Sequence, residues 1–208
     1  MKHLIYYSQH ARTSGNFDDL MKAGRMDIVC HVLINSFFLS HRIREDVTLH
    51  LVFAGPPDPI KHIEIYPKKV VEETGKQAGK EGIDISKKDI IGLIKKMLYK
   101  YKPGKKTEVW PGYFIEKKPL LKIIEELRSK GVEIYVLDEK GKDIRSIKFE
   151  KDSAFVLGDH EGLPKPELRR LKKKSELISL GNKIYFASQA VTILHHELDI
   201  QEKFNLPT

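Results

Sequence analysis

Three stretches of the sequence lead from an apolar strand pattern straight into a loop that contains glycine: VLDEKG (residues 136–141), VLGDHEGLP (156–164) and LISLGNKIY (177–185). Loops that follow the carboxyl ends of parallel strands form the ligand sites of α/β folds. Each loop on its own is explained equally well as a strand-ending turn. Together they predict an α/β fold with a parallel sheet and one pocket built largely from backbone amides.

Helical patterns alternate with these strands, as expected for a parallel sheet. Pro119 begins one predicted helix and Gly131 ends it, and Pro166 begins another. The remaining expected elements are strands at 3–7, 47–53, 60–66, 132–137, 154–157 and 177–180, helices at 26–39 and 188–200, a helix opened by a capping box at Ser86–Asp89, and a loop over 100–113.

The charge of the chain is concentrated in one segment. The whole sequence of 208 residues carries a net charge of +8, with 40% hydrophobic residues, which suits one domain with a substantial core. Residues 61–118, here called the basic extension, contain 15 lysines, no arginine and 8 acidic residues, a balance of +7. Such a surface attracts polyanions, nucleic acids first.

Several classes of function lack support in the sequence. No apolar run reaches the roughly 18–20 residues that span a bilayer, and Cys30, the only cysteine, forms no internal disulfide. The glycine patterns of phosphate-binding loops and dinucleotide folds and the nucleophile elbow are missing. His195 and His196 are adjacent, which is not zinc-ligand spacing, so no metal is expected. We expect a soluble, cytoplasmic protein.

The C-terminal motifs resemble a known class of enzymes. Leu137, then FVLGDHEGLPKPEL (155–168) and ISLGNKIYFASQAVTILHHELD (178–199), resemble in order the three cofactor-loop motifs of the SPOUT class of S-adenosylmethionine-dependent RNA methyltransferases. The rest of the chain, including GNFDDLMKAGRMDIVCHVL (15–33) and VFAGPPDP (52–59), resembles the archaeal branch of that class that methylates N1 of pseudouridine 54 in the T-loop of tRNA. A relative that methylates pseudouridine N1 in small-subunit ribosomal RNA shares the class.

The resemblance implies a fold and a cofactor. It implies a single SPOUT domain over residues 1–208, with a parallel sheet, helices on both faces, a C-terminal trefoil knot within 132–208 and a small β-hairpin/helix extension at 61–118. S-adenosylmethionine would bind in the knotted loops, and a homodimer would pack through the knot. The implied cofactor-binding residues are Leu137, Gly158, Leu180, Gly181, Lys183, Tyr185, Ala187 and Ser188. On the final helix, the apolar Val191, Leu194 and Leu198 suggest the dimer surface.

The chemistry requires a proton acceptor near the target base, because the N1–H of pseudouridine is a poor nucleophile until it is deprotonated or polarised. Asp58, in the proline-rich turn after the strand at 47–53, is the expected general base, although an aspartate there also serves a turn. Asp159 and Glu161 are its rivals beside the cofactor loop. Tyr185 is expected to hydrogen-bond or stack on the base, or else to fill core.

RNA recognition is expected from an unstacked base and from phosphate contacts. Arg12, Arg25 and Asp27 are candidates for binding the flipped-out nucleotide. The alternative is that these charged residues only form a surface ion pair. Lys105 and Lys106 are expected to contact tRNA phosphates. A non-catalytic RNA-binding α/β protein would use the same basic surface, so this alternative stays open at the level of sequence.

Overall fold

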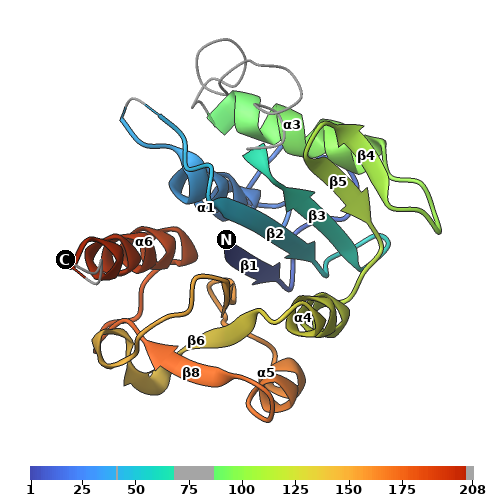
Figure 1. Ribbon diagram of the computed structural model, residues 1–208. Coiled ribbons are helices and arrows are strands. Elements are labelled where there is room, and N and C mark those ends of the chain that lie inside the picture. The colour runs from blue at the N-terminus through green and yellow to red at the C-terminus, as the bar shows by residue number, and fades with distance from the viewer. Residues whose placement is uncertain (41, 68–86, 205–208) are drawn as a thin grey trace.

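The computed structural model describes residues 1–40, 42–67 and 87–204. Within them, one eight-stranded sheet has the order β4-β5-β3-β2-β1-β7-β6-β8 (Figure 1). The strands are β1 (Lys2–Ser8), β2 (Val47–Phe53), β3 (Lys61–Ile65), β4 (Thr107–Trp110), β5 (Tyr113–Glu116), β6 (Glu133–Asp143), β7 (Ser153–Leu157) and β8 (Glu176–Ser179).

Five neighbouring strands, β2, β1, β7, β6 and β8, pair in parallel, which confirms the predicted α/β fold. Beyond β2, the strands β3, β5 and β4 pair antiparallel and close one edge of the sheet. The prediction of an uninterrupted loop over 100–113 is wrong, because β4 lies inside it. Thr107–Trp110 is a short strand of alternating half-buried and exposed residues, and the prolines and lysines around it hide that pattern.

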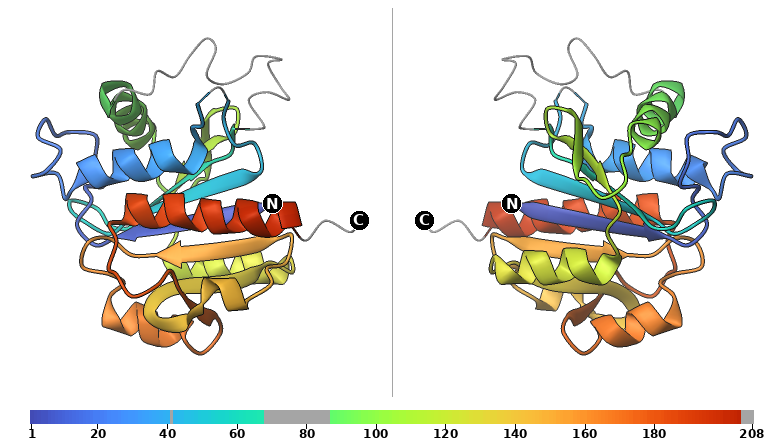
Figure 2. Two further views of the ribbon diagram at one scale, coloured as in Figure 1. Left: turned by 90° about the vertical axis from the view of Figure 1, so that its left-hand side faces the viewer. Right: turned by 90° about the vertical axis from the view of Figure 1, so that its right-hand side faces the viewer.

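Helices cover both faces of the sheet, as predicted. The helices are α1 (Met26–Phe37), α3 (Lys87–Tyr99), α4 (Leu120–Ser129), α5 (Lys165–Leu171) and α6 (Ala187–Phe204), with a short 3-10 turn at Ile144–Ser146. Apolar residues of α1, α3 and α6 share one core cluster, and those of α4 and α5 share a second. The two views of Figure 2 show α1 and α6 in front of the sheet on one side and α4 on the other. Ser86 of the predicted capping box lies outside the described residues, and no described helix is long and apolar enough to cross a membrane.

The apolar face of α6 is buried within this chain. Val191 and Leu194 are fully buried and Leu198 is 8% exposed, in the core cluster that also holds α1. The amide nitrogen of the Asn35 side chain, on α1, donates to the Ser188 carbonyl at 2.9 Å. The expectation that these three apolar residues form a dimer surface is therefore wrong, because α1 already covers them.

Two residues of β6, five positions apart, pair with the same residue of β8. Ile178 is in register with both Leu137 and Lys142 of β6. A Cβ added to Gly141 would lie 2.4–2.6 Å from backbone atoms of Ile178, so only glycine allows this approach. The segment between Leu137 and Lys142 thus curls closely around β8.

Candidate functional site

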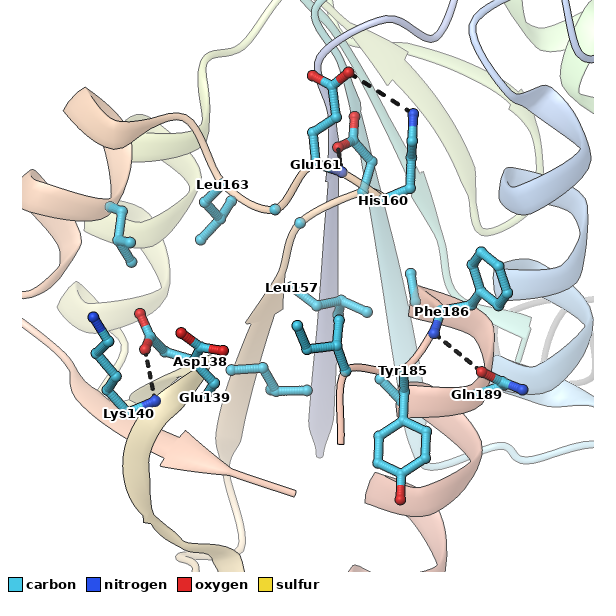
Figure 3. A pocket seen from close by; sticks show the side chains of 18 of the residues that line it. Asp138, Glu139, Lys140, Leu157, His160, Glu161, Leu163, Tyr185, Phe186 and Gln189 are labelled. Carbon is cyan, nitrogen blue, oxygen red and sulfur yellow. Dashed lines mark hydrogen bonds and ion pairs between the residues drawn. The ribbon is translucent and has the colours of Figure 1, made fainter. Parts of the chain in front are cut away.

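A pocket of about 640 Å³ opens at the carboxyl end of β7, and its wall is completed by residues 137–140 within β6 and by the segment that leads into α6. Each of the three glycine-containing segments that the sequence analysis joined into one site contributes residues to this pocket, which confirms them as neighbours in space. In Figure 3, Asp138 and Glu139 lie across the pocket from Phe186 and Gln189, with Leu157 between them. Pockets of roughly 300–1,000 Å³ that combine apolar walls with a few polar groups are typical ligand sites.

The predicted cofactor residues divide into three groups. Leu137, Gly158, Tyr185 and Ala187 line the pocket. Leu180, Gly181 and Lys183 line an adjoining cavity of about 140 Å³, which shares Leu137 and Tyr185 with the first. Ser188 lines neither cavity; it is 9% exposed and its carbonyl accepts hydrogen bonds from the side chains of Asn35 and Thr192.

The loop after β7 folds tightly back on itself. A Cβ on Gly158 would lie 2.2 Å from the carbonyl carbon of Gly162 and 2.5 Å from the nitrogen of Leu163. The Asp159 carboxylate accepts hydrogen bonds from the backbone nitrogens of Gln9, at 2.7 Å, and Glu161, at 3.0 Å. Gly158 is therefore required by the packing of the loop, before any ligand is considered, and Asp159 holds the loop in place.

Asp58 is held by two lysines of the basic extension. Its carboxylate accepts from the ammonium of Lys117 at 2.6 Å and from that of Lys61 at 2.5 Å, and these hydrogen bonds lower its pKa to about 2. Lys61 is 2% exposed, and its ammonium also lies 3.9 Å from the centre of the Tyr101 ring. Asp58 is outside the lining of the pocket. A carboxyl with so low a pKa accepts a proton fully only after a lysine has moved away, so the role of general base stays a prediction.

Glu161 lies at the rim of the pocket beside a histidine that the sequence analysis missed. Its Oε2 is 3.0 Å from Nε2 of His10, and this hydrogen bond lowers the pKa of Glu161. The side chain of Glu161 is 53% exposed. Of the three carboxylates considered as base, Glu161 is the one that lines the pocket with an accessible oxygen.

The candidate nucleotide-binding residues lie on loops at the carboxyl ends of β1 and β2 and, for Asp27, in the first turn of α1. A Cβ on Gly24 or Gly55 would collide with the carbonyl oxygen of His10, at 1.8 and 2.3 Å, so these loops are in direct contact. The Arg25 guanidinium donates to both Asp27 oxygens at 3.0 and 2.9 Å, which is the ion pair expected under the alternative interpretation. Nε of Arg12 is buried and has no hydrogen-bond partner among the described residues.

The two lysines predicted to contact phosphates differ in their surroundings. Lys106 donates to the Glu64 carboxylate at 2.9 Å and lies 4.5 Å from the centre of the Phe114 ring. Lys105 is exposed in the turn before β4. Trp110, at the end of β4, keeps 38% of its surface exposed against the edge of Tyr113. Lys105 and Trp110 are therefore presented to solvent on the same hairpin.

The chain is similar to RNA methyltransferases over almost its whole length. A family model described as "Putative SAM-dependent RNA methyltransferase" matches residues 1–203. The tRNA (pseudouridine(54)-N(1))-methyltransferase of Methanopyrus kandleri is 34% identical over 206 residues, which cover 97% of this chain and 94% of that protein. The protein of the same name from Thermococcus gammatolerans is 33% identical over 195 residues, covering 91% and 92%.

A solved structure shows the same fold. The crystal structure of Archaeoglobus fulgidus Nep1 bound to S-adenosylhomocysteine matches with a TM-score of 0.57 and 17% identity, over 90% of this chain and 76% of that one. At this identity the likeness concerns the fold alone. The family model and the relatives above 30% identity show which family this is. The chain belongs to the family of S-adenosylmethionine-dependent RNA methyltransferases that includes the tRNA (pseudouridine(54)-N(1))-methyltransferases.

Proposed function

We propose that the protein transfers the methyl group of S-adenosylmethionine to N1 of pseudouridine 54 in the T-loop of tRNA. The observation that carries this proposal is the pocket of about 640 Å³ between residues 137–140 of β6, the loop after β7 and the start of α6, in a chain whose relatives of that name match it over more than nine tenths of its length. S-adenosylmethionine supplies a methyl group bound to a positively charged sulfur.

The residues of the pocket fit that cofactor chemically. Leu137, Leu157 and Leu163 provide apolar surface suited to an adenine ring. Asp138 and Glu139 add carboxylates that can accept hydrogen bonds from ribose hydroxyls or an amino group. The Cβ-free backbone at Gly158 keeps the loop after β7 folded beneath the opening. These residues would hold the cofactor, and Tyr185 at the edge would contact the target base.

The base itself would sit between the pocket and the loops that carry Arg12, Arg25 and Asp27. Methyl transfer requires the attacking nitrogen to be held near the methyl carbon at about 3–3.5 Å and in line with it. Arg12 is half-buried there, and its guanidinium would donate hydrogen bonds to the nucleotide. Glu161, oriented by His10, and Asp58 are the two groups that could accept the N1 proton.

Binding of the tRNA body would come from the basic extension. Lys105 and the other exposed lysines there attract phosphates, and the half-exposed indole of Trp110 offers a surface on which a loop base can stack. The described part of this extension is the β3 strand, α3 and the β4–β5 hairpin, all joined to the sheet. This supports a single domain over residues 1–208, and a tRNA substrate supports a location in the cytoplasm.

The same proposal includes a C-terminal trefoil knot and a homodimer. The curl of residues 137–142 around Ile178 supports the knot, because it forms a loop through which the chain toward α6 can pass. Ile184 and Phe186 support the dimer, because these large apolar side chains are 88% and 55% exposed. Light scattering should give about twice the chain mass of 24.0 kDa at micromolar concentration, and a monomer would contradict the dimer.

The function is tested with a labelled methyl donor and two matched RNAs. The protein is incubated with trideuteromethyl S-adenosylmethionine and a tRNA transcript that contains either pseudouridine or uridine at position 54, and nucleosides are mapped by mass spectrometry. We expect deuterated N1-methylpseudouridine at position 54 of the first RNA and none in the second. If a ribosomal RNA fragment were labelled and the tRNA were not, ribosomal RNA would be the substrate. Tight RNA binding without any methyl transfer would favour the non-catalytic alternative.

A further inference from the structure

Three histidines form a row across the sheet, away from the pocket, and two of them are buried. His3 lies on β1, His50 on β2 and His62 on β3, and none of them lines the pocket described above. Nδ1 of His3 is 3.0 Å from Nε2 of His50, and Nδ1 of His50 is 2.9 Å from Nε2 of His62. His50 and His62 are 3% and 1% exposed. This row lies outside the pocket and has no part in the methyl transfer described above.

The outer nitrogen of His62 is fixed by a carboxylate. Nδ1 of His62 lies 3.3 Å from Oε1 of Glu116, which fits an N–H donating to that carboxylate. A neutral imidazole has one N–H and one lone pair. The lone pair of His62 on Nε2 is then directed toward His50, and a carboxylate behind a histidine is the usual support of a metal ligand.

A second carboxylate completes the cluster. Glu64 lies on β3 directly opposite His50 in the strand register. One of its oxygens, Nδ1 or Nε2 of His50 and a ring nitrogen of His62 all lie within 4.8 Å of one another. The ammonium of Lys106 neutralises Glu64 at 2.9 Å, and both side chains reach solvent, with exposed fractions of 39% and 22%. The cluster therefore has one open side, which the side chain of Lys106 covers.

We propose that His50, His62 and Glu64 bind one divalent transition-metal ion, with zinc as the best match to two imidazoles and a carboxylate. Zinc–nitrogen bonds of about 2.0–2.1 Å in a tetrahedral site would separate the two ring nitrogens to roughly 3.3 Å, a few tenths of an ångström more than the present spacing. The metal takes the place of Lys106 as the positive charge beside Glu64. Water fills the fourth position on the open side.

The histidine row accommodates the ion without acquiring charge. In the metal-free chain, N–H of His50 donates from Nδ1 to His62. When Nδ1 binds the metal, the proton of His50 moves to Nε2 and donates to Nδ1 of His3, whose own proton moves to its other nitrogen. All three rings stay neutral, so the row does not bear the cost of burying a charged imidazolium. The alternative is a hydrogen-bonded row that binds no metal.

The test is zinc binding by the full chain after chelator treatment, followed by isothermal titration calorimetry and by the visible absorption of bound Co²⁺. We expect one saturable ion per chain and the d–d bands of a tetrahedral cobalt site. Glu64→Gln should raise the dissociation constant at least tenfold, and His62→Gln should abolish binding. His196→Gln is the matched control, because His196 is exposed on α6, and it should bind as the unmodified protein does.

Three results would overturn the proposal: no saturable zinc binding, equal affinity in Glu64→Gln, or an equal decrease in His196→Gln. If His62→Gln fails to fold, Glu64→Gln decides alone, because Glu64 lies at the open side and the substitution keeps its size. Binding of S-adenosylhomocysteine is measured in the same metal-free sample. Intact cofactor binding without zinc binding would reject the metal site and leave the proposed function untouched.

Discussion

The pocket and the Asp58 turn lie at neighbouring strand ends, yet the chain holds them in opposite ways. The pocket depends on backbone shape: Gly158 lets the loop after β7 fold back, and Leu137, Leu157 and Leu163 form the apolar part of the wall. The turn depends on charge, because Lys61 and Lys117 of the basic extension clamp Asp58. Shape-dependent sites fail when an atom is added, whereas charge-dependent sites respond to pH and salt.

The largest effect is expected from adding atoms beneath the pocket. In Gly158→Val, the new Cβ collides with the backbone of Gly162 and Leu163, which the loop cannot relieve by moving a side chain. Overpacking costs typically about 1–3 kcal/mol of stability and more where backbone must move. We expect a lower Tm and at least a hundredfold loss of S-adenosylhomocysteine affinity in calorimetry.

Gly92→Ala is the control for that substitution. Gly92 lies on α3, and outside the backbone of its own helix no atom is within 4 Å of an added Cβ. Alanine there should stabilise the protein by up to about 1 kcal/mol. Unchanged cofactor affinity in Gly158→Val would show that the loop after β7 does not form the site.

A smaller effect is expected from removing the charge at the turn. Asp58→Asn should lower kcat by roughly 10²–10⁴ if Asp58 accepts the N1 proton, with little change in cofactor affinity. The deficit should shrink as pH rises, because ionisation of N1–H then replaces the missing base. In the unmodified enzyme, the pKa of Asp58 is lowered to about 2. Asp58 is therefore charged above that pH and produces no acid limb in the rate profile between about pH 4 and 7.

An Asp58→Asn variant that melts earlier but turns over normally would assign Asp58 to the turn alone. Glu161→Gln is then the next variant to assay, because Glu161 lines the pocket. A lower kcat in Glu161→Gln, with no change in Asp58→Asn, would place the proton acceptor at the rim of the pocket, beside His10.

The smallest effect is expected on RNA affinity. Lys105→Glu should reduce the slope of log affinity against log salt by roughly 0.7–0.9 for each phosphate that the side chain no longer neutralises. Lys106→Glu is the informative comparison, since Lys106 already pairs with Glu64. Filter-binding titrations over a salt series measure both slopes. An unchanged slope in Lys105→Glu would show that the RNA-binding surface lies outside the β4–β5 hairpin.

Sequence predicted the shape-dependent region better than the charge-dependent one. The apolar strands and glycines of 136–141 and 156–164 are local signals, and both segments do line the pocket. The partners of Asp58 could not be predicted, because Lys117 lies 59 residues away and only the pairing of β3 with β5 brings it close. Two further features also depend on tertiary contacts and could not be predicted: α1 covers Leu194, and His50 lies beside His62.

The division of the molecule into a cofactor region and an RNA region is tested most directly by amide hydrogen exchange. The protein is measured alone, with S-adenosylhomocysteine, and with tRNA. We predict that the cofactor slows exchange in residues 137–140, 157–163 and 180–190 and leaves the β4–β5 hairpin unchanged, whereas tRNA slows exchange in residues 99–113. Protection of the hairpin by S-adenosylhomocysteine, with none in residues 137–140 or in the loop after β7, would contradict the account.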